Sequence, residues 1–177
     1  ALPGEAAQPR DEAEERARGT RLHRLLEHLP LWPEARWPDL AADLLAQDAD
    51  GPPDAADTAA LLEEARAVLA APELAFLFAP GTLAEVGIAA PLGPHRMLGS
   101  IDRLVVAPDR VLAVDYKSNA VIPARPDGVP EGLVRQMAAY RAGLRALFPD
   151  RAVEVALLWT RAARLMPLPD AMLDAAL

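Results

Sequence analysis

Two aspartates and a lysine between positions 102 and 117 carry the most chemistry in this sequence. Asp102 lies near the start of one apolar segment, and Asp115 and Lys117 lie at the end of the next. Carboxylate oxygens bind hard divalent cations such as Mg²⁺ and leave positions open for water and substrate phosphate. A neighbouring ammonium group can orient or deprotonate a water molecule, or stabilise charge that develops on a phosphate. These residue types therefore predict hydrolysis of a phosphodiester.

The two apolar segments predict an antiparallel hairpin that brings the aspartates together. Pro108 in the turn 107–110 cannot adopt a positive φ, which favours a four-residue loop around a type I turn. The numbers of opposing residues then sum to 217, so Asp102 lies opposite Asp115 and Lys117 shares their face of the sheet. Two facing carboxylates repel each other unless a cation lies between them.

An alternative interpretation treats these residues as ordinary surface ion pairs. Asp102 would then pair with Arg103 or Arg110, and Asp115 would pair with Lys117. The apolar runs beside the aspartates instead indicate strands that are buried on both faces, where unpaired acids are costly.

Lys117 is also unusual in the composition of the chain. It is the one lysine among 18 basic residues, and the one asparagine, Asn119, follows two residues later. Only lysine offers a compact point charge on a flexible stem whose pKa can be tuned. The retention of an ammonium group at this position therefore favours a functional lysine over chance.

The length and composition of the chain restrict its class. A chain of 177 residues can form one domain with a core, and the absence of cysteine excludes disulfides, thiolate zinc sites and iron–sulfur clusters. A metal would have to be bound by oxygen and imidazole. No signal segment and no run of about 18 apolar residues is present. We therefore expect a cytoplasmic protein that has no contact with a membrane and is a fragment of a larger chain.

The net charge of −8 is the opposite of what phosphate contacts require, but the acidity is concentrated in the first part of the chain. Residues 1–80 hold 7 basic and 16 acidic side chains, whereas residues 81–177 hold 11 basic and 10 acidic ones. Charge therefore neither supports nor excludes a nucleic-acid partner.

The periodicity of apolar residues predicts one α/β domain over 1–177, with a helical part (1–80) and a catalytic part (81–177). The order of the elements implies a mixed central sheet flanked by helices. The third helix would be capped by Asp57 or Thr58. Expected helices cover 11–29, 40–47, 58–71, 131–148 and the C-terminus, and expected strands cover 82–89, 97–106, 111–117, 153–160 and 164–167.

Four segments together resemble the PD-(D/E)XK nucleases, specifically the AddA and RecB branch. They lie in the expected order and span roughly residues 15–165. The segments are R-G-T-R-L-H at 18–23, similar to a G-x-x-x-H helix motif; G-S-I-D-R-L at 99–104, similar to a G-x-x-D strand; V-D-Y-K-S-N at 114–119, similar to V-D-Y-K-T-N; and Gln136 with Tyr140, which match Q-x-x-x-Y.

The resemblance implies a restriction-endonuclease-like fold and a set of site residues. Asp102, Asp115 and Lys117 would be catalytic. The metal ligands would be His23, Asp102, Asp115 and the backbone carbonyl of Tyr116, with Glu85 as an additional acid. The metal would be Mg²⁺, although a histidine ligand makes Mn²⁺ plausible.

Gln136 and Tyr140 are spaced i, i+4 and would share one helix face, where the resemblance gives them contacts to DNA. Arg135 would add a phosphate contact. The alternative is that Tyr140 is packed in the core and Gln136 is a surface amide.

The resemblance further implies a deoxyribonuclease, with exonuclease action expected, that serves as the nuclease module of an AddAB/RecBCD-type double-strand-break repair helicase-nuclease. Its partners would be DNA, the parent helicase motor and an AddB-type subunit. One alternative is a catalytically silent module that binds DNA or a partner. Another is a stand-alone nuclease of a mobile element or defence system.

Overall fold

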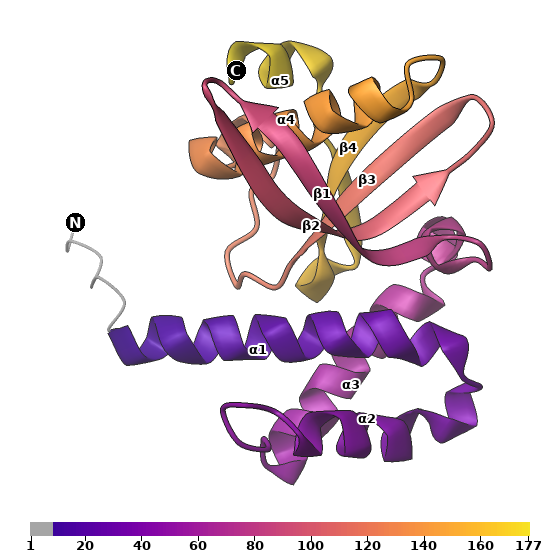
Figure 1. Ribbon diagram of the computed structural model, residues 1–177. Helices are drawn as coiled ribbons and strands as arrows, with labels where there is room; N and C mark the ends of the chain where they lie inside the picture. The colour runs from indigo at the N-terminus through magenta and orange to yellow at the C-terminus, as the bar shows by residue number, and fades with distance from the viewer. Residues whose placement is uncertain (1–8) are drawn as a thin grey trace. The chain divides into compact units, whose positions relative to one another are not determined.

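The computed structural model describes residues 9–177, which form two compact units (Figure 1). The first, here called the N-terminal unit, ends at Arg66, and the C-terminal unit comprises Ala67–Leu177. None of the described helices is both long and apolar enough to cross a membrane.

The N-terminal unit is helical, as its periodicity predicts. Leucines 22, 25 and 26 of the first helix and Leu29 directly after it recur at helical spacing and are buried. The second helix begins at Trp37, three residues before the predicted start, because Pro38 falls in its first turn, where a missing N–H costs nothing. The elements are α1 (Pro9–His28), η1 (Leu29–Leu31), η2 (Glu34–Arg36), α2 (Trp37–Ala46) and α3 (Ala55–Ala70), which continues into the C-terminal unit.

The N-terminal cap of α3 differs from the prediction. Asp54 Oδ1 accepts the backbone N–H of Asp57 at 2.8 Å, and the Asp54 carbonyl accepts the N–H of Thr58. Asp54 is therefore the capping residue, and the assignment of the cap to Asp57 or Thr58 was wrong. The sequence motif D-x-x-D left the choice between acids open, and only the helix boundary at Ala55 decides it.

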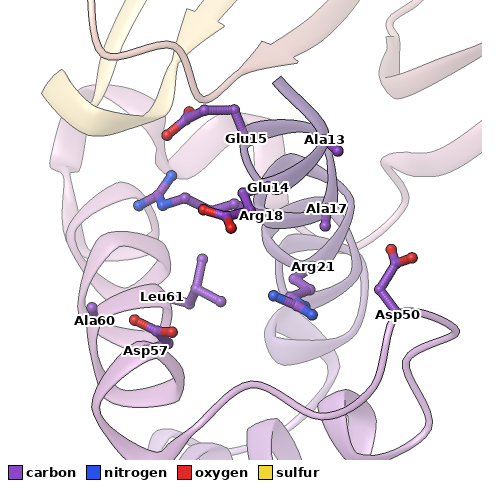
Figure 2. Close-up of a pocket in the computed structure, with 10 residues that line it drawn as sticks. All are labelled: Ala13, Glu14, Glu15, Ala17, Arg18, Arg21, Asp50, Asp57, Ala60 and Leu61. Atoms are coloured by element: carbon purple, nitrogen blue, oxygen red, sulfur yellow. The ribbon is translucent and has the colours of Figure 1, made fainter. Parts of the chain in front are cut away.

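Two arginines of the R-G-T-R-L-H segment hold this unit together. Arg18 of α1 pairs with Glu64 of α3, and Arg21 pairs with Asp48 in the loop after α2. Both arginines line a pocket between α1, α3 and that loop (Figure 2). Burial alone would raise the pKa of Asp48, but the hydrogen bonds from Arg21 and the Asp50 N–H, together with the charges of Arg21 and Arg24, outweigh it, and the pKa lies below its ordinary value. These arginines therefore have a structural role within α1–α3.

The C-terminal unit contains a five-stranded sheet in the order β1-β2-β3-β4-β5. Neighbouring strands are antiparallel except β3 and β4, which are parallel. The predicted α/β class with a mixed sheet flanked by helices is confirmed. The elements are η3 (Pro72–Phe78), β1 (Leu83–Leu92), β2 (His95–Val106), β3 (Arg110–Lys117), η4 (Pro126–Gly128), α4 (Glu131–Leu147), β4 (Ala152–Trp159), η5 (Thr160–Ala162), β5 (Arg164–Pro167) and α5 (Asp170–Ala175).

The predicted hairpin register of β2 and β3 is confirmed. Val106 pairs with Val111 and Leu104 with Ala113, so paired residue numbers sum to 217. The Ala107 N–H donates to the Arg110 carbonyl and closes the turn.

Helix α4 connects the parallel strands β3 and β4, because such strands require a crossover. It packs on β1 and β4, and α5 packs on α4 (Figure 1). Arg141 of α4 is buried and pairs with Asp170 and Asp174 of α5. The apolar core between α4 and the sheet includes Met137, Leu144 and Leu157.

Candidate active site

The site is formed where the hairpin of β2 and β3 stops being a regular ladder. The last residue pair is Arg103 with Val114, and the next step in that register would place Asp102 opposite Asp115. At this step the Tyr116 N–H donates to a side chain: the distance from its nitrogen to Asp102 Oδ2 is 2.7 Å. Asp102 is therefore buried and fixed by the backbone of the strand that carries Asp115 and Lys117.

Asp115 is buried beside a second carboxylate and an ammonium group. Burial and, secondly, the charge of Asp102 raise the pKa of Asp115 to about 6, although Lys117 opposes the shift. Lys117 Nζ lies 2.8 Å from Asp115 Oδ2. The alternative interpretation expected this ion pair, but at the surface, whereas the Asp115 side chain is 8% exposed and Lys117 is half-buried. The three residues thus form one charged cluster at the edge of the core.

Glu85 extends the cluster from the neighbouring strand. Ala84 pairs with Arg103 and Val86 with Ile101, so Glu85 falls opposite Asp102 at a gap in the ladder. A carboxylate oxygen of Glu85 lies within 4.8 Å of one of Asp102. Glu85 is exposed, which opens the cluster to solvent on this side.

The backbone of Glu85 is in the left-handed region, with φ of 50°. A residue with a Cβ in this region is strained by roughly 1–3 kcal/mol, and such residues cluster at functional sites. Ser100 of β2 donates its hydroxyl to Glu85 Oε2 at 3.1 Å and holds the side chain at the cluster.

Helix α4 contributes an uncharged hydrogen-bonded pair. Gln136 Nε2 donates to Tyr140 Oη at 2.8 Å, and the Tyr140 hydroxyl donates to the Ser100 carbonyl at 3.3 Å. Burial raises the pKa of Tyr140, while the charges of Asp115 and Asp102 raise it further. Tyr140 is buried, as the packing alternative expected, yet its hydroxyl also connects α4 to the strand that carries Asp102.

A glycine allows this approach of α4 to β2. A Cβ built at Gly99 would lie 2.6 Å from Tyr140 Oη and 2.8 Å from its Cε1. The tyrosine ring therefore occupies the space that a side chain would need. Gly99 and Tyr140, which belong to two of the four motif segments, thus form one packing contact.

Tyr116 lies between Asp115 and Lys117 in the sequence, and its side chain points to the other face of the sheet. Tyr116 Oη accepts the Arg103 Nε–H at 3.1 Å, and its ring packs at a tilt against Phe78 of η3. The Arg103 guanidinium lies 4.9 Å from the centroid of the Phe78 ring. This packing anchors the strand segment whose backbone binds Asp102.

The two remaining predicted site residues lie on helices. His23 lies on α1 of the N-terminal unit and is half-buried. Arg135 is exposed on α4 and pairs with Glu131 at 3.3 Å. Ser100 was not among the predicted site residues, although its place between Gly99 and Asp102 in the G-S-I-D-R-L segment was a signal.

The donor set of this cluster fits a hard divalent cation. Asp102, Asp115 and Glu85 offer carboxylate oxygens, the ligands that Mg²⁺ and Mn²⁺ prefer. Asp115 Oδ2 is buried, and apart from its ion pair with Lys117 no hydrogen-bond partner for it exists among residues 9–177. A buried oxygen with spare acceptor capacity beside a like charge favours a cation.

Two comparisons with known proteins bear on this site. The family model of the PD-(D/E)XK nuclease superfamily matches residues 3–167, so the chain belongs to this superfamily. None of the curated proteins matches the chain. The mixed five-stranded sheet with its flanking helices is consistent with the restriction-endonuclease-like fold of the superfamily, whose nucleases use divalent metals.

Proposed function

We propose that this chain is a divalent-metal-dependent deoxyribonuclease that hydrolyses phosphodiester bonds at the Asp102, Asp115 and Lys117 cluster. The observation that supports the proposal is the burial of two aspartates side by side with an ammonium group 2.8 Å from one of them. Such an arrangement is costly for stability alone, because buried like charges repel. A divalent cation between the two carboxylates would offset this cost.

Each residue has a distinct part in the proposed reaction. Asp102 and Asp115 would bind the cation, with Glu85 and the Tyr116 carbonyl as further ligands. A bound divalent cation would supply positive charge that lowers the pKa of a water molecule and stabilises charge on the phosphate. Lys117 would hydrogen-bond the attacking water or a phosphate oxygen, since its half-buried ammonium group shares the face of Asp115.

His23 would complete the ligand set according to the family resemblance. The test is the affinity for Mn²⁺, measured by calorimetry, in His23→Ala and in His28→Ala as a matched control on the same helix. We expect a loss of about 10-fold or more only in His23→Ala. Equal affinities in the two variants would remove His23 from the site.

The wider context of the nuclease is also a proposal. The four motifs support a nuclease module of the AddA type, tethered to a helicase motor and acting with an AddB-type subunit in double-strand-break repair in the cytoplasm. Exonuclease action is the expected mode. Gln136, Tyr140 and Arg135 would contact DNA, since α4 carries all three and reaches the cluster through the hydroxyl of Tyr140.

The deciding experiment is cleavage of labelled single- and double-stranded DNA with Mg²⁺, Mn²⁺ or EDTA. We expect metal-dependent cutting that Asp115→Ala abolishes together with metal binding. Lys117→Ala should lower the rate about 10²- to 10⁴-fold while metal still binds. Lys117→Arg tests the role of the ammonium group, because arginine donates hydrogen bonds but does not accept a proton.

A catalytically silent module that binds DNA or a partner subunit is the second candidate. It is favoured by the existing ion pair between Lys117 and Asp115, which stabilises the cluster without a metal. DNA binding without cutting under every metal condition would support this candidate and contradict the nuclease proposal.

A further inference from the structure

A pocket lies at the chain segment that follows Lys117. It is formed by the segment between β3 and α4 together with the end of β4, and its volume is about 550 Å³. Pockets that bind small ligands have volumes of roughly 300–1,000 Å³. The lining includes Asn119, Val121, Pro123, Arg125 and Trp159. Its walls are therefore mainly apolar, with polar groups at a few positions.

The pocket is continuous with the proposed catalytic face. Trp159, which forms part of its wall, pairs with Lys117 in the parallel register of β3 and β4. Paired residues of neighbouring strands share one face of a sheet. Asn119, also in the wall, follows Lys117 by two residues. A ligand in the pocket would therefore lie next to a phosphate bound at Lys117.

Trp159 carries an unsatisfied donor. Its side chain is 2% exposed, and its Nε1–H is buried without an acceptor among the described residues. A buried donor that lacks a partner is rare and calls for an explanation, such as an acceptor supplied by a ligand. The prolines of the lining also provide flat apolar surfaces against which a planar ring can pack.

The rim of the pocket is positively charged. Arg164 Nη2 donates to the Ala124 carbonyl at 2.6 Å, and Arg161 Nε donates to the Ser118 carbonyl at 2.8 Å. These two bonds hold both guanidinium groups against the loop that forms the pocket. Arg125 is exposed and lies 3.5 Å from Asp127, the one acid of the lining. This rim suits the phosphates of a nucleic acid.

We propose that the pocket receives one unpaired nucleobase of the DNA strand, adjacent to the phosphodiester at Lys117. A base inside a duplex is stacked and paired, whereas an unpaired base can leave the stack and enter a pocket. Its ring stacks on the apolar wall, its acceptors reach the pocket's donors, and its phosphates contact the arginine rim. The pocket thereby selects single-stranded or frayed DNA. This inference rests on the proposed deoxyribonuclease function.

The first test removes the base and keeps the backbone. The full chain carrying Lys117→Ala, which blocks cleavage in the proposed mechanism, is titrated with fluorescent single-stranded oligonucleotides that contain one abasic site at successive positions. We expect anisotropy to report binding that is about 5- to 100-fold weaker at one position only, because loss of one stacked base costs that much. The same affinity for every position of the abasic site would contradict the proposed binding of a base in the pocket.

The second test changes the protein. Val121, 84% exposed at the pocket, is replaced in Val121→Asp, and Leu98, 81% exposed on β2 and outside the pocket, is replaced in Leu98→Asp as the matched control. Only Val121→Asp should weaken binding, and in that variant the abasic site should have no further effect. Equal DNA affinity of the two variants would contradict the proposed binding of a base in the pocket. It would leave the nuclease proposal unaffected. A wild-type chain that neither binds nor cuts DNA would overturn both proposals.

Discussion

The Asp102 carboxylate replaces a backbone acceptor for the N–H of Tyr116, at 2.7 Å. The last ladder pair of β2 and β3 is thus followed by a bond from side chain to backbone. This bond orients Asp102 within the cluster, and it ties the end of β3 that carries Asp115 to β2 beyond their last ladder pair.

The first prediction compares Asp102→Asn with Asp102→Ala in EDTA. Both variants remove the charge, but asparagine keeps an acceptor for the buried N–H and alanine leaves it unsatisfied. We expect Asp102→Ala to be less stable than Asp102→Asn by about 1–3 kcal/mol in urea unfolding. Both variants should lose Mn²⁺ affinity. Equal stability of the two would mean that the Tyr116 N–H finds another acceptor.

The second prediction concerns the raised pKa of Asp115. A carboxyl group whose pKa is about 6 in the folded protein and 3.8 unfolded destabilises the metal-free fold as the pH rises between these values. The full effect, about 3 kcal/mol, is present above about pH 6. Asp115→Asn should therefore be more stable than the wild type at pH 7.5 in EDTA.

The pH profile provides the control for that prediction. The stability difference should shrink as the pH falls below 6 and disappear at about pH 3, where Asp115 is protonated in both states. Added Mg²⁺ or Mn²⁺ should stabilise the wild type above about pH 6 and should leave Asp115→Asn unchanged. A constant difference across this pH range would contradict the burial of a charged Asp115.

The third prediction uses the left-handed backbone of Glu85. Glycine adopts a positive φ without the steric cost that any Cβ brings. Glu85→Gly should therefore be more stable than Glu85→Ala by about 1 kcal/mol, although glycine in a regular strand is the less stable choice. The comparison is made by thermal unfolding in EDTA. A more stable alanine variant would show that Glu85 has ordinary strand geometry in solution.

The fourth prediction tests the contact between Gly99 and Tyr140. Gly99→Ala forces a Cβ against the tyrosine ring and should cost about 1–3 kcal/mol. In a Tyr140→Ala background the same substitution should cost much less, which a double-mutant cycle measures. Gly87→Ala, where an added Cβ meets nothing within 4 Å, is the control. Additive costs at positions 99 and 140 would rule out the contact.

The sequence by itself determined the elements and the local geometry of the central hairpin. The strand 164–167 was predicted with its observed bounds, and the sum rule of 217 for β2 and β3 is confirmed by the pairs from Val106 with Val111 to Arg103 with Val114. Both follow from short-range causes. Side chains alternate along a strand, and a turn around Pro108 leaves one register that keeps the apolar faces aligned.

The tertiary structure alone decided which distant segments meet at the site. The pairing of Lys117 with Trp159 depends on a parallel crossover through α4, and the contact of Gly99 with Tyr140 joins residues 41 positions apart. The left-handed backbone at Glu85 likewise has no mark in the sequence around it. Contacts across such separations are set by the packing of the whole sheet and helix, because no local preference for a turn or a side-chain period encodes them.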